Sequence, residues 1–395
     1  MSDTTLDRIL KQCHSFVANP DSNYMDDIFA QKLKAFSNPA FSSEDQKKLC
    51  TYHHKLILTE VIPAYQELAD SLESLRGTGK SSRGLAFFEG GREYYLYLLQ
   101  SQTGTYVPVG QIEKRMSAQL LSDYREISSL LKQDPSLIDR LNQCSSELTL
   151  TPTQMLEKLP ELMEKDFPEL KDATYELRTV HPSMKKFLSP AFYLTPPVDT
   201  RSPNVIYIND SGRTSSLELF GTLAHEGFPG HLYQTVSFAG NNPSDIRYLV
   251  TSSGYVEGWA TYVESYGYEY AASLMNDPDS AKNAVRLAWL NRSMNLCIYS
   301  LIDIGIHYRG WDAARTAVFL KAFGINNAST AAEIYQYIVE TPGNYLKYYW
   351  GYLNFLDLKT VCQKRLGDDF DLKEFHRRIL DIGPVQFPVL EKYMK

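Results

Sequence analysis

The stretch LAHEGFPGHLYQ, residues 223–234, holds two histidines and a glutamate close together, at His225, Glu226 and His231. Zinc hydrolases use such imidazole and carboxylate groups as ligands, and they need a further carboxylate beside the metal as a base. The zinc-protease pattern H-E-x-x-H places its second histidine four residues after the first, where this chain has Pro229. The stretch therefore predicts either a metal site of altered geometry or a turn that contains two histidines.

A regular helix cannot bring these two histidines to one ion. Residues six apart on a helix point about 240° apart and are separated by a rise of about 9 Å. Pro229 has no N–H to donate, and Gly230 tolerates unusual backbone angles. We expect the helix to break there, so that His231 takes the place of the second histidine and Glu226 faces a metal-bound water. The alternative is a helix-ending turn in which backbone groups satisfy both histidines.

The segment SSGYVEGWATYVESYGYE, residues 252–269, is expected to form a helix that supplies the third ligand. Glu257 and Glu264 are seven residues apart, so they lie on the same helical face, among aromatic and aliphatic neighbours. A half-buried carboxylate needs a partner, and a metal ion is a suitable one. A salt-bridged or solvent-facing glutamate is the alternative. The two segments together favour a metal site.

The remaining sequence predicts a mainly α-helical framework. Helical periodicity and capping signals recur up to about residue 170 and again from about residue 214 to the end. Between them, three short segments rich in β-branched and aromatic residues predict a small β-sheet. These segments are 174–180, 191–194 and 204–209. We expect an N-terminal helical region, 1–170, and a catalytic region, 171–395, that interlock.

Composition excludes several classes of protein. The 395 residues are 43% hydrophobic and 22% charged, which is typical of a globular protein. A net charge of −7 without a long basic run argues against a nucleic-acid partner. None of the five cysteines forms C-x-x-C, so neither a disulfide framework nor a thiolate zinc site is expected. The sequence has no apolar stretch long enough to span a membrane, so no membrane insertion is expected. No feature indicates an oligomeric state. The start MSDTTLDRILKQ lacks a signal-peptide pattern, which favours a cytoplasmic location.

HEGFPGHLYQ followed by VEGWATYVE resembles the H-E-x-x-P-G-H and E-G-W-A-x-Y motifs of the bacterial family catalogued as domain of unknown function 885 (DUF885). Segments 301–320, 341–351 and 383–394 are also similar to that family, so the resemblance covers about residues 90 to 395. The family is grouped with zinc metallopeptidases of the gluzincin type, whose third ligand is a glutamate on a later helix. The resemblance implies a multi-helical metallopeptidase-like fold with a small β-sheet next to the active-site helices. Members are often longer and exported, which implies a location outside the cytoplasm for a longer native protein.

Carried over by position, the resemblance implies that His225, His231 and Glu257 bind one Zn²⁺ per chain. It implies that Glu226 is the base. We expect Glu264 to lie next to the ligands without binding the ion itself.

Three further residues match family positions and are implied to line the site: Asp303, His307 and Tyr348. His307 or Tyr348 could donate a hydrogen bond to the oxyanion of a tetrahedral intermediate. The alternatives are a core His307 bonded to Asp303, and plain packing for Tyr348. The chain departs from the family at Leu232, often histidine, and at Tyr299, often arginine, and both departures concern substrate contacts.

These residues predict a zinc metallopeptidase that acts on short peptides, with a peptide or small amide as substrate. Glu226 would take a proton from the metal-bound water and pass it to the leaving amine. The strand expected at 204–209 is a candidate sheet edge along which a peptide could bind by strand addition. The alternatives are a metal-dependent amidase or esterase on a non-peptide substrate, and a non-catalytic helical binding protein. The intact Glu226 argues against the last of these.

Overall fold

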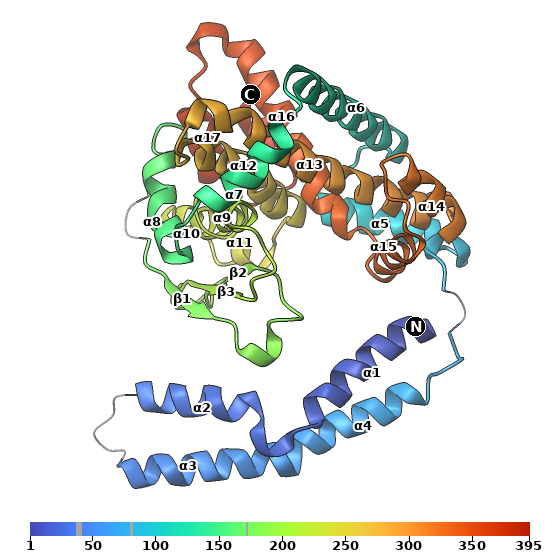
Figure 1. Ribbon diagram of the computed structural model, residues 1–395, viewed down its shortest axis with the longest axis vertical. Helices are drawn as coiled ribbons and strands as arrows, with labels where there is room; N and C mark the ends of the chain where they lie inside the picture. Colours follow the sequence, from blue (N-terminus) through green and yellow to red (C-terminus); the bar gives the residue numbers. More distant parts are fainter. Residues whose placement is uncertain (37–41, 80–81, 171–172) are drawn as a thin grey trace. The chain divides into compact units, whose positions relative to one another are not determined.

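The fold is mainly α-helical with one small β-sheet, which confirms the predicted fold class (Figure 1). The computed structural model describes residues 1–36, 42–79, 82–170 and 173–395. The chain forms two compact units, Met1–Arg83 and Gly84–Lys395.

The N-terminal unit is built of helices in which α1 packs against α4 and α2 against α3. Its helical segments are α1 (Asp3–Val17), η1 (Pro20–Ser22), α2 (Tyr24–Ala35), α3 (Ser43–Leu56), η2 (Ile57–Val61) and α4 (Ile62–Glu73). The segment η2 is a π-helical turn, closed by a hydrogen bond from the Ile62 N–H to the Ile57 carbonyl. It ends at Val61, two residues before Pro63, which has no N–H to continue the regular helical ladder.

The larger unit contains the motif helices. Its helical segments are η3 (Leu85–Phe87), α5 (Gly91–Thr103), α6 (Val109–Gln133), α7 (Leu137–Glu147), α8 (Pro152–Met163), η4 (Pro182–Met184), α9 (Ser216–Glu226), α10 (His231–Gly240), α11 (Ile246–Leu249), α12 (Ser253–Ser273), α13 (Pro278–Ile304), η5 (Gly305–Arg309), α14 (Ala313–Lys321), α15 (Ala328–Glu340), α16 (Asn344–Leu366), η6 (Gly367–Asp369), α17 (Leu372–Ile382) and α18 (Phe387–Met394). Within the described residues, no helix is both long enough and apolar enough to span a bilayer.

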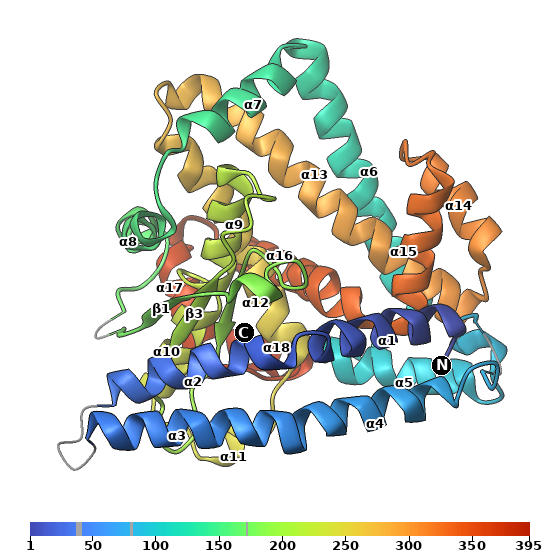
Figure 2. The ribbon, with the colours of Figure 1, turned by 60° about the horizontal axis from the view of Figure 1, so that its bottom comes forward.

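The compact units divide the chain at Arg83 rather than near residue 170. The expected boundary falls at residues 171–172, which lie outside the described residues. Helices α6 and α7 both pack along α13, and α8 packs on α9, so these three helices belong to the same unit as the motif. Figure 2 shows α6 and α13 side by side. Periodicity alone cannot reveal such a grouping, because it depends on which helix faces meet.

The three expected strands form one sheet with the order β1-β3-β2. Their bounds are β1 (Glu176–Thr179), β2 (Ala191–Leu194) and β3 (Val205–Ile208). Strand β3 pairs in parallel with β1 and antiparallel with β2. The sheet edge expected at 204–209 is therefore wrong, because β3 is paired on both sides. The strand that packs against α9 is β2, at an edge of this sheet.

Helix α12 runs through the centre of the larger unit and packs against α9, α13 and α16 (Figure 1). It is buried along most of its length, and its side chains include the fully buried Tyr255, Trp259 and Tyr262. Large aromatic side chains bury much apolar area, so they make this helix a rigid support. The position of α12 fixes where Glu257 and Glu264 lie.

Candidate metal centre

The chain leaves the helix between the two histidines of the motif, as predicted. Helix α9 ends at Glu226 and α10 begins at His231. Gly230 has non-helical angles, φ −83° and ψ −133°, and a Cβ added to it would lie 1.8 Å from the His225 carbonyl oxygen. Only glycine fits this position, because any side chain would collide with backbone. The peptide bond before Pro229 is cis.

The turn between α9 and α10 is tied to α12 by one hydrogen bond. The indole Nε1 of Trp259 donates to the Pro229 carbonyl oxygen at 2.9 Å. Trp259 is fully buried, and a buried indole N–H requires such a partner. The tryptophan of the second motif therefore fixes the turn of the first.

Three side chains converge where these elements meet. His225 Nε2 lies 3.7 Å from Glu257 Oε2, and His231 Nε2 lies 3.3 Å from the same oxygen. Zinc–ligand bonds of 2.0–2.1 Å in a tetrahedron place two ligand atoms about 3.3 Å apart. The donor set and its spacing thus fit a zinc ion held by His225, His231 and Glu257.

Glu226 lies beside this cluster and is held by the sheet. Ligand atoms of His225, Glu226 and His231 all lie within 4.8 Å of one another. The backbone N–H of Tyr193 on β2 donates to Glu226 Oε2 at 2.9 Å. Because Glu257 makes the shorter contacts to both imidazoles, it is the better candidate for the third ligand, and Glu226 is the neighbouring carboxylate.

Glu264 supports His225 from the side opposite the candidate ion. Its Oε2 lies 3.3 Å from His225 Nδ1, and its Oε1 accepts a hydrogen bond of 2.9 Å from Arg292 Nε on α13. A carboxylate on the second ring nitrogen fixes the tautomer and orientation of a metal-binding histidine. The sequence did not indicate Arg292, although a buried glutamate requires a cation or a donor.

Helix α16 contributes two residues to the site. Lys347 Nζ lies 3.6 Å from Glu257 Oε1, the carboxylate oxygen that does not face the imidazoles. The ring of Tyr348 lies 6.3 Å from that of His225, between centroids. Burial, then the carboxylates of Glu257 and Glu226, raise the pKa of Tyr348 above its usual value, which keeps the hydroxyl protonated. Sequence reasoning identified Tyr348 and missed Lys347, the residue directly before it.

The charges at the centre favour a cation. Burial alone would lower the pKa of His225, but the carboxylates of Glu257, Glu264 and Glu226 outweigh burial and raise it. Burial likewise raises the pKa of Glu257, and His225 and His231 outweigh that effect and hold it below its usual value. The carboxylates therefore stabilise a positive charge between them, which an imidazolium or a bound metal ion can supply.

Glycines bring α12 and α16 into backbone contact next to Glu257. A Cβ added to Gly258 would lie 2.5 Å from the Cα and carbonyl carbon of Gly351. A Cβ added to Gly351 would lie 2.2 Å from the Gly254 carbonyl oxygen. The glycines of the two motifs therefore face each other, and their contact places Glu257 beside Tyr348.

His307 and Asp303 do not take the places expected of them. His307 Nδ1 accepts from the Leu85 N–H at 3.1 Å, and its Nε2 donates to the Ile338 carbonyl at 2.8 Å. With both ring nitrogens bound to backbone, His307 has no donor for a substrate oxyanion, so the expected catalytic role is corrected to a structural one. Asp303 accepts from the Tyr95 hydroxyl at 2.5 Å and from the Gly343 N–H at 2.9 Å. These contacts include no residue of the candidate metal centre. They also include no hydrogen bond between Asp303 and His307, which was the alternative for this pair.

The two departures from the family pattern are accommodated differently. Leu232, next to His231, is fully buried and belongs to the hydrophobic core. Tyr299 is partly buried, and its ring lies 5.1 Å from that of Tyr345. The first departure therefore affects packing, whereas the second lies on a surface that a ligand could reach.

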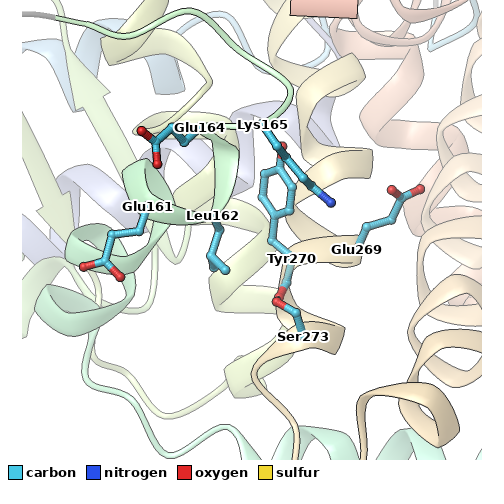
Figure 3. Close-up of a pocket in the computed structure, with 7 residues that line it drawn as sticks. All are labelled: Glu161, Leu162, Glu164, Lys165, Glu269, Tyr270 and Ser273. Atoms are coloured by element: carbon cyan, nitrogen blue, oxygen red, sulfur yellow. The ribbon is translucent and has the colours of Figure 1, made fainter.

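One cavity of the larger unit lies away from the candidate ligands. It has a volume of about 510 Å³ and lies between α8 and α12 (Figure 3). Its lining is Glu161, Leu162, Glu164, Lys165, Glu269, Tyr270 and Ser273. None of the candidate ligands lines this cavity, so it is not part of the candidate metal centre.

The family model described as "Bacterial protein of unknown function (DUF885)" matches residues 1–394. The chain belongs to this family. The match of DUF885 includes the N-terminal helices, so it extends beyond the expected range of about 90 to 395. No curated protein matches the sequence.

Two solved structures share the fold of this DUF885 chain. A "putative lipoprotein from Colwellia psychrerythraea" is 21% identical with a TM-score of 0.83, over 100% of this chain and 70% of that one. A "putative lipoprotein of unknown function from Shewanella oneidensis" is 17% identical with a TM-score of 0.60, over 92% of this chain and 69% of that one. At these identities the likeness concerns the fold alone.

Replacing Glu264 by glutamine is expected to lower zinc affinity by about 10- to 100-fold, the usual effect of losing the group that orients a ligand. The change removes the negative charge of the Glu264 carboxylate, which contacts both His225 and Arg292, and it keeps the size of the side chain. Zinc titration against a competing chelator measures it. Glu269→Gln, the same change at an exposed position of α12, is the control. Equal affinities for the two variants would contradict the role given to Glu264.

Proposed function

We propose that this protein is a zinc metallopeptidase that hydrolyses short peptides. The observation that carries the proposal is the convergence of His225, His231 and Glu257 at separations of 3.3 and 3.7 Å, with Glu226 beside them. A structural zinc site uses four protein ligands, whereas a catalytic site keeps one position open. Three ligands with an adjacent unassigned carboxylate are the arrangement of the catalytic kind.

Each residue of the site has a defined task in this proposal. A bound Zn²⁺ would polarise the scissile carbonyl and lower the pKa of a water molecule toward neutrality. Glu226, held at Oε2 by the Tyr193 N–H, accepts the proton of the attacking water and returns it to the leaving amine. The protonated Tyr348 hydroxyl donates a hydrogen bond to the developing oxyanion. Glu264 keeps the Nε2 of His225 directed at the ligand cluster.

Metal analysis and a substrate screen test this function. We expect about one zinc per chain, loss of that zinc in His225→Ala and Glu257→Ala, and retention in His14→Ala, which changes an exposed histidine. Chelation should abolish peptide hydrolysis and added zinc should restore it. A protein that binds no zinc contradicts the proposal.

The substrate screen separates peptide hydrolysis from the other interpretations. The panel contains short peptides, acyl esters and N-acyl amino acids. Hydrolysis of the esters or N-acyl compounds alone would indicate an amidase or esterase on a non-peptide substrate. Zinc binding without hydrolysis of any compound would indicate a non-catalytic binding protein.

We extend the proposal to the location of the protein. The two solved structures are described as those of putative lipoproteins, which favours export over the cytoplasmic location expected from the first residues of the sequence. Fractionation of the native cells tests this point. Recovery of the protein in the cytoplasmic fraction alone would contradict it.

A further inference from the structure

Arg292 on α13 contacts the candidate metal centre through only one of its guanidinium nitrogens. Its Nε donates to Glu264 Oε1 at 2.9 Å, and Glu264 is buried with 5% of its side chain exposed. The side chain of Arg292 nevertheless remains 42% exposed. Among the described residues, neither terminal nitrogen of its guanidinium has a hydrogen-bond partner. The guanidinium therefore keeps free donors next to the site.

A cavity lined by tyrosines lies two helical turns from Arg292 on the same face of α13. Arg292 and Tyr299 are seven residues apart on α13, so they lie on the same face of the helix. Burial raises the pKa of Tyr299 and of Tyr345, and the positive charge of Arg292 opposes both shifts. Tyr299, Tyr345 and Ile334 line a cavity of about 220 Å³. Since a water molecule occupies about 30 Å³, this cavity has room for one amino-acid side chain.

We propose that Arg292 binds the C-terminal carboxylate of the peptide substrate, with the last side chain in the Tyr299–Tyr345 cavity. This inference rests on the proposed peptidase function and makes the enzyme one that acts from the C-terminus. A guanidinium matches the planar geometry of a carboxylate and binds it through paired N–H donors. Lys347 is the less suitable cation, because its side chain is 20% exposed against 42% for Arg292 and its ammonium lies 3.6 Å from the candidate ligand Glu257.

The position of Arg292 suits the release of a short fragment. One carboxylate, that of Glu264, separates its Nε from His225 Nδ1, through contacts of 2.9 and 3.3 Å. Arg292 lies on the Nδ1 side of the His225 ring, so the substrate must pass around that ring to reach it. An extended chain covers about 3.5 Å per residue, so a few residues suffice for this distance. The reaction remains a hydrolysis, in which the water oxygen bonds to the carbonyl carbon and the C–N bond breaks. The water proton passes through Glu226 to the leaving amine, and the carboxylate on Arg292 is unchanged.

Calorimetry on the full-length, zinc-loaded Glu226→Gln protein tests the inference without catalysis. The probes are acetyl-Ala-Ala-Phe and its C-terminal amide. We expect the free acid to bind roughly 10- to 100-fold more tightly, as is usual for a hydrogen-bonded charge. Adding Arg292→Gln should reduce this ratio to about twofold or less. Arg286→Gln is the matched control, since Arg286 lies on the same helix and pairs with Glu126 instead.

Two variants separate carboxylate recognition from the positioning of Glu264. Arg292→Lys keeps a charge beside Glu264 and should retain zinc while losing most of the preference for the acid. Glu264→Gln should weaken zinc binding while keeping that preference. The inference would be overturned if the parent protein bound the acid and the amide equally, or bound neither. It would also be overturned if the Arg292 variants lost affinity for the acid and for the amide to the same extent. Zinc content and hydrolysis of amidated peptides, measured in the otherwise unchanged protein, report on the proposed function separately.

Discussion

Replacing Glu226 by glutamine is expected to lower kcat for peptide hydrolysis by about 10²- to 10⁴-fold, the usual contribution of a general base. The amide has nearly the same shape and can still accept the Tyr193 N–H bond that holds Oε2 in the native protein. It cannot accept a proton from water at neutral pH. Because Glu257 makes the shorter contacts to the two histidines, zinc should stay bound. Steady-state kinetics and metal analysis of the same sample measure both effects.

Glu269→Gln is the control for the change at Glu226. Glu269 is exposed on α12 and lies outside the candidate metal centre, so its substitution should leave kcat unchanged. Full activity in Glu226→Gln would show that another group is the base. Loss of both zinc and activity would show that Glu226 is a metal ligand. This is the main alternative, because ligand atoms of Glu226, His225 and His231 lie within 4.8 Å of one another.

Replacing Gly258 by alanine is expected to destabilise the larger unit by about 1–3 kcal/mol, the usual effect of overpacking a close contact. The added Cβ would meet Gly351 backbone at 2.5 Å, so α12 and α16 must separate. Separation would displace Glu257, the neighbour of Gly258, and a displacement of about 1 Å at a reacting group can cost about 10²-fold in rate. Unfolding in denaturant measures the first effect, and zinc affinity with kcat measures the second.

Gly110→Ala is the matched control for the helix crossing. Gly110 lies in α6 at a negative φ, and a Cβ added there meets no atom within 4 Å. Alanine is the better helix former, so this variant should be as stable as the native protein or slightly more stable. If Gly258→Ala behaved like Gly110→Ala in stability and zinc affinity, the crossing of α12 and α16 would not be what positions Glu257.

Local features of the candidate site could be read from the sequence. The helix break between His225 and His231 follows from Pro229 and Gly230, because backbone preference acts over a few residues. The shared face of Glu257 and Glu264 likewise follows from the helical repeat. The three strands and the mainly helical fold were also predicted, since their periodicity is a property of short segments.

Other features depend on which elements meet in the folded chain. The predictions for these features were wrong or were not made. The sequence placed His307 at the site, but packing gives both of its ring nitrogens to backbone groups of Leu85 and Ile338. Strand order was equally hidden, because a strand such as β3 does not reveal whether it pairs on one side or on both.

The sequence by itself therefore determined the types of the candidate ligands, their helices and the break between the histidines. Only the tertiary structure decided which partners those side chains meet. Arg292 reaches Glu264 because α13 packs on α12, and Glu257 lies beside Tyr348 because Gly258 and Gly351 let α12 and α16 touch. The physical reason is the range of the interactions. Backbone preferences act within a few residues, whereas these contacts join segments dozens of residues apart and depend on the packing of whole helices.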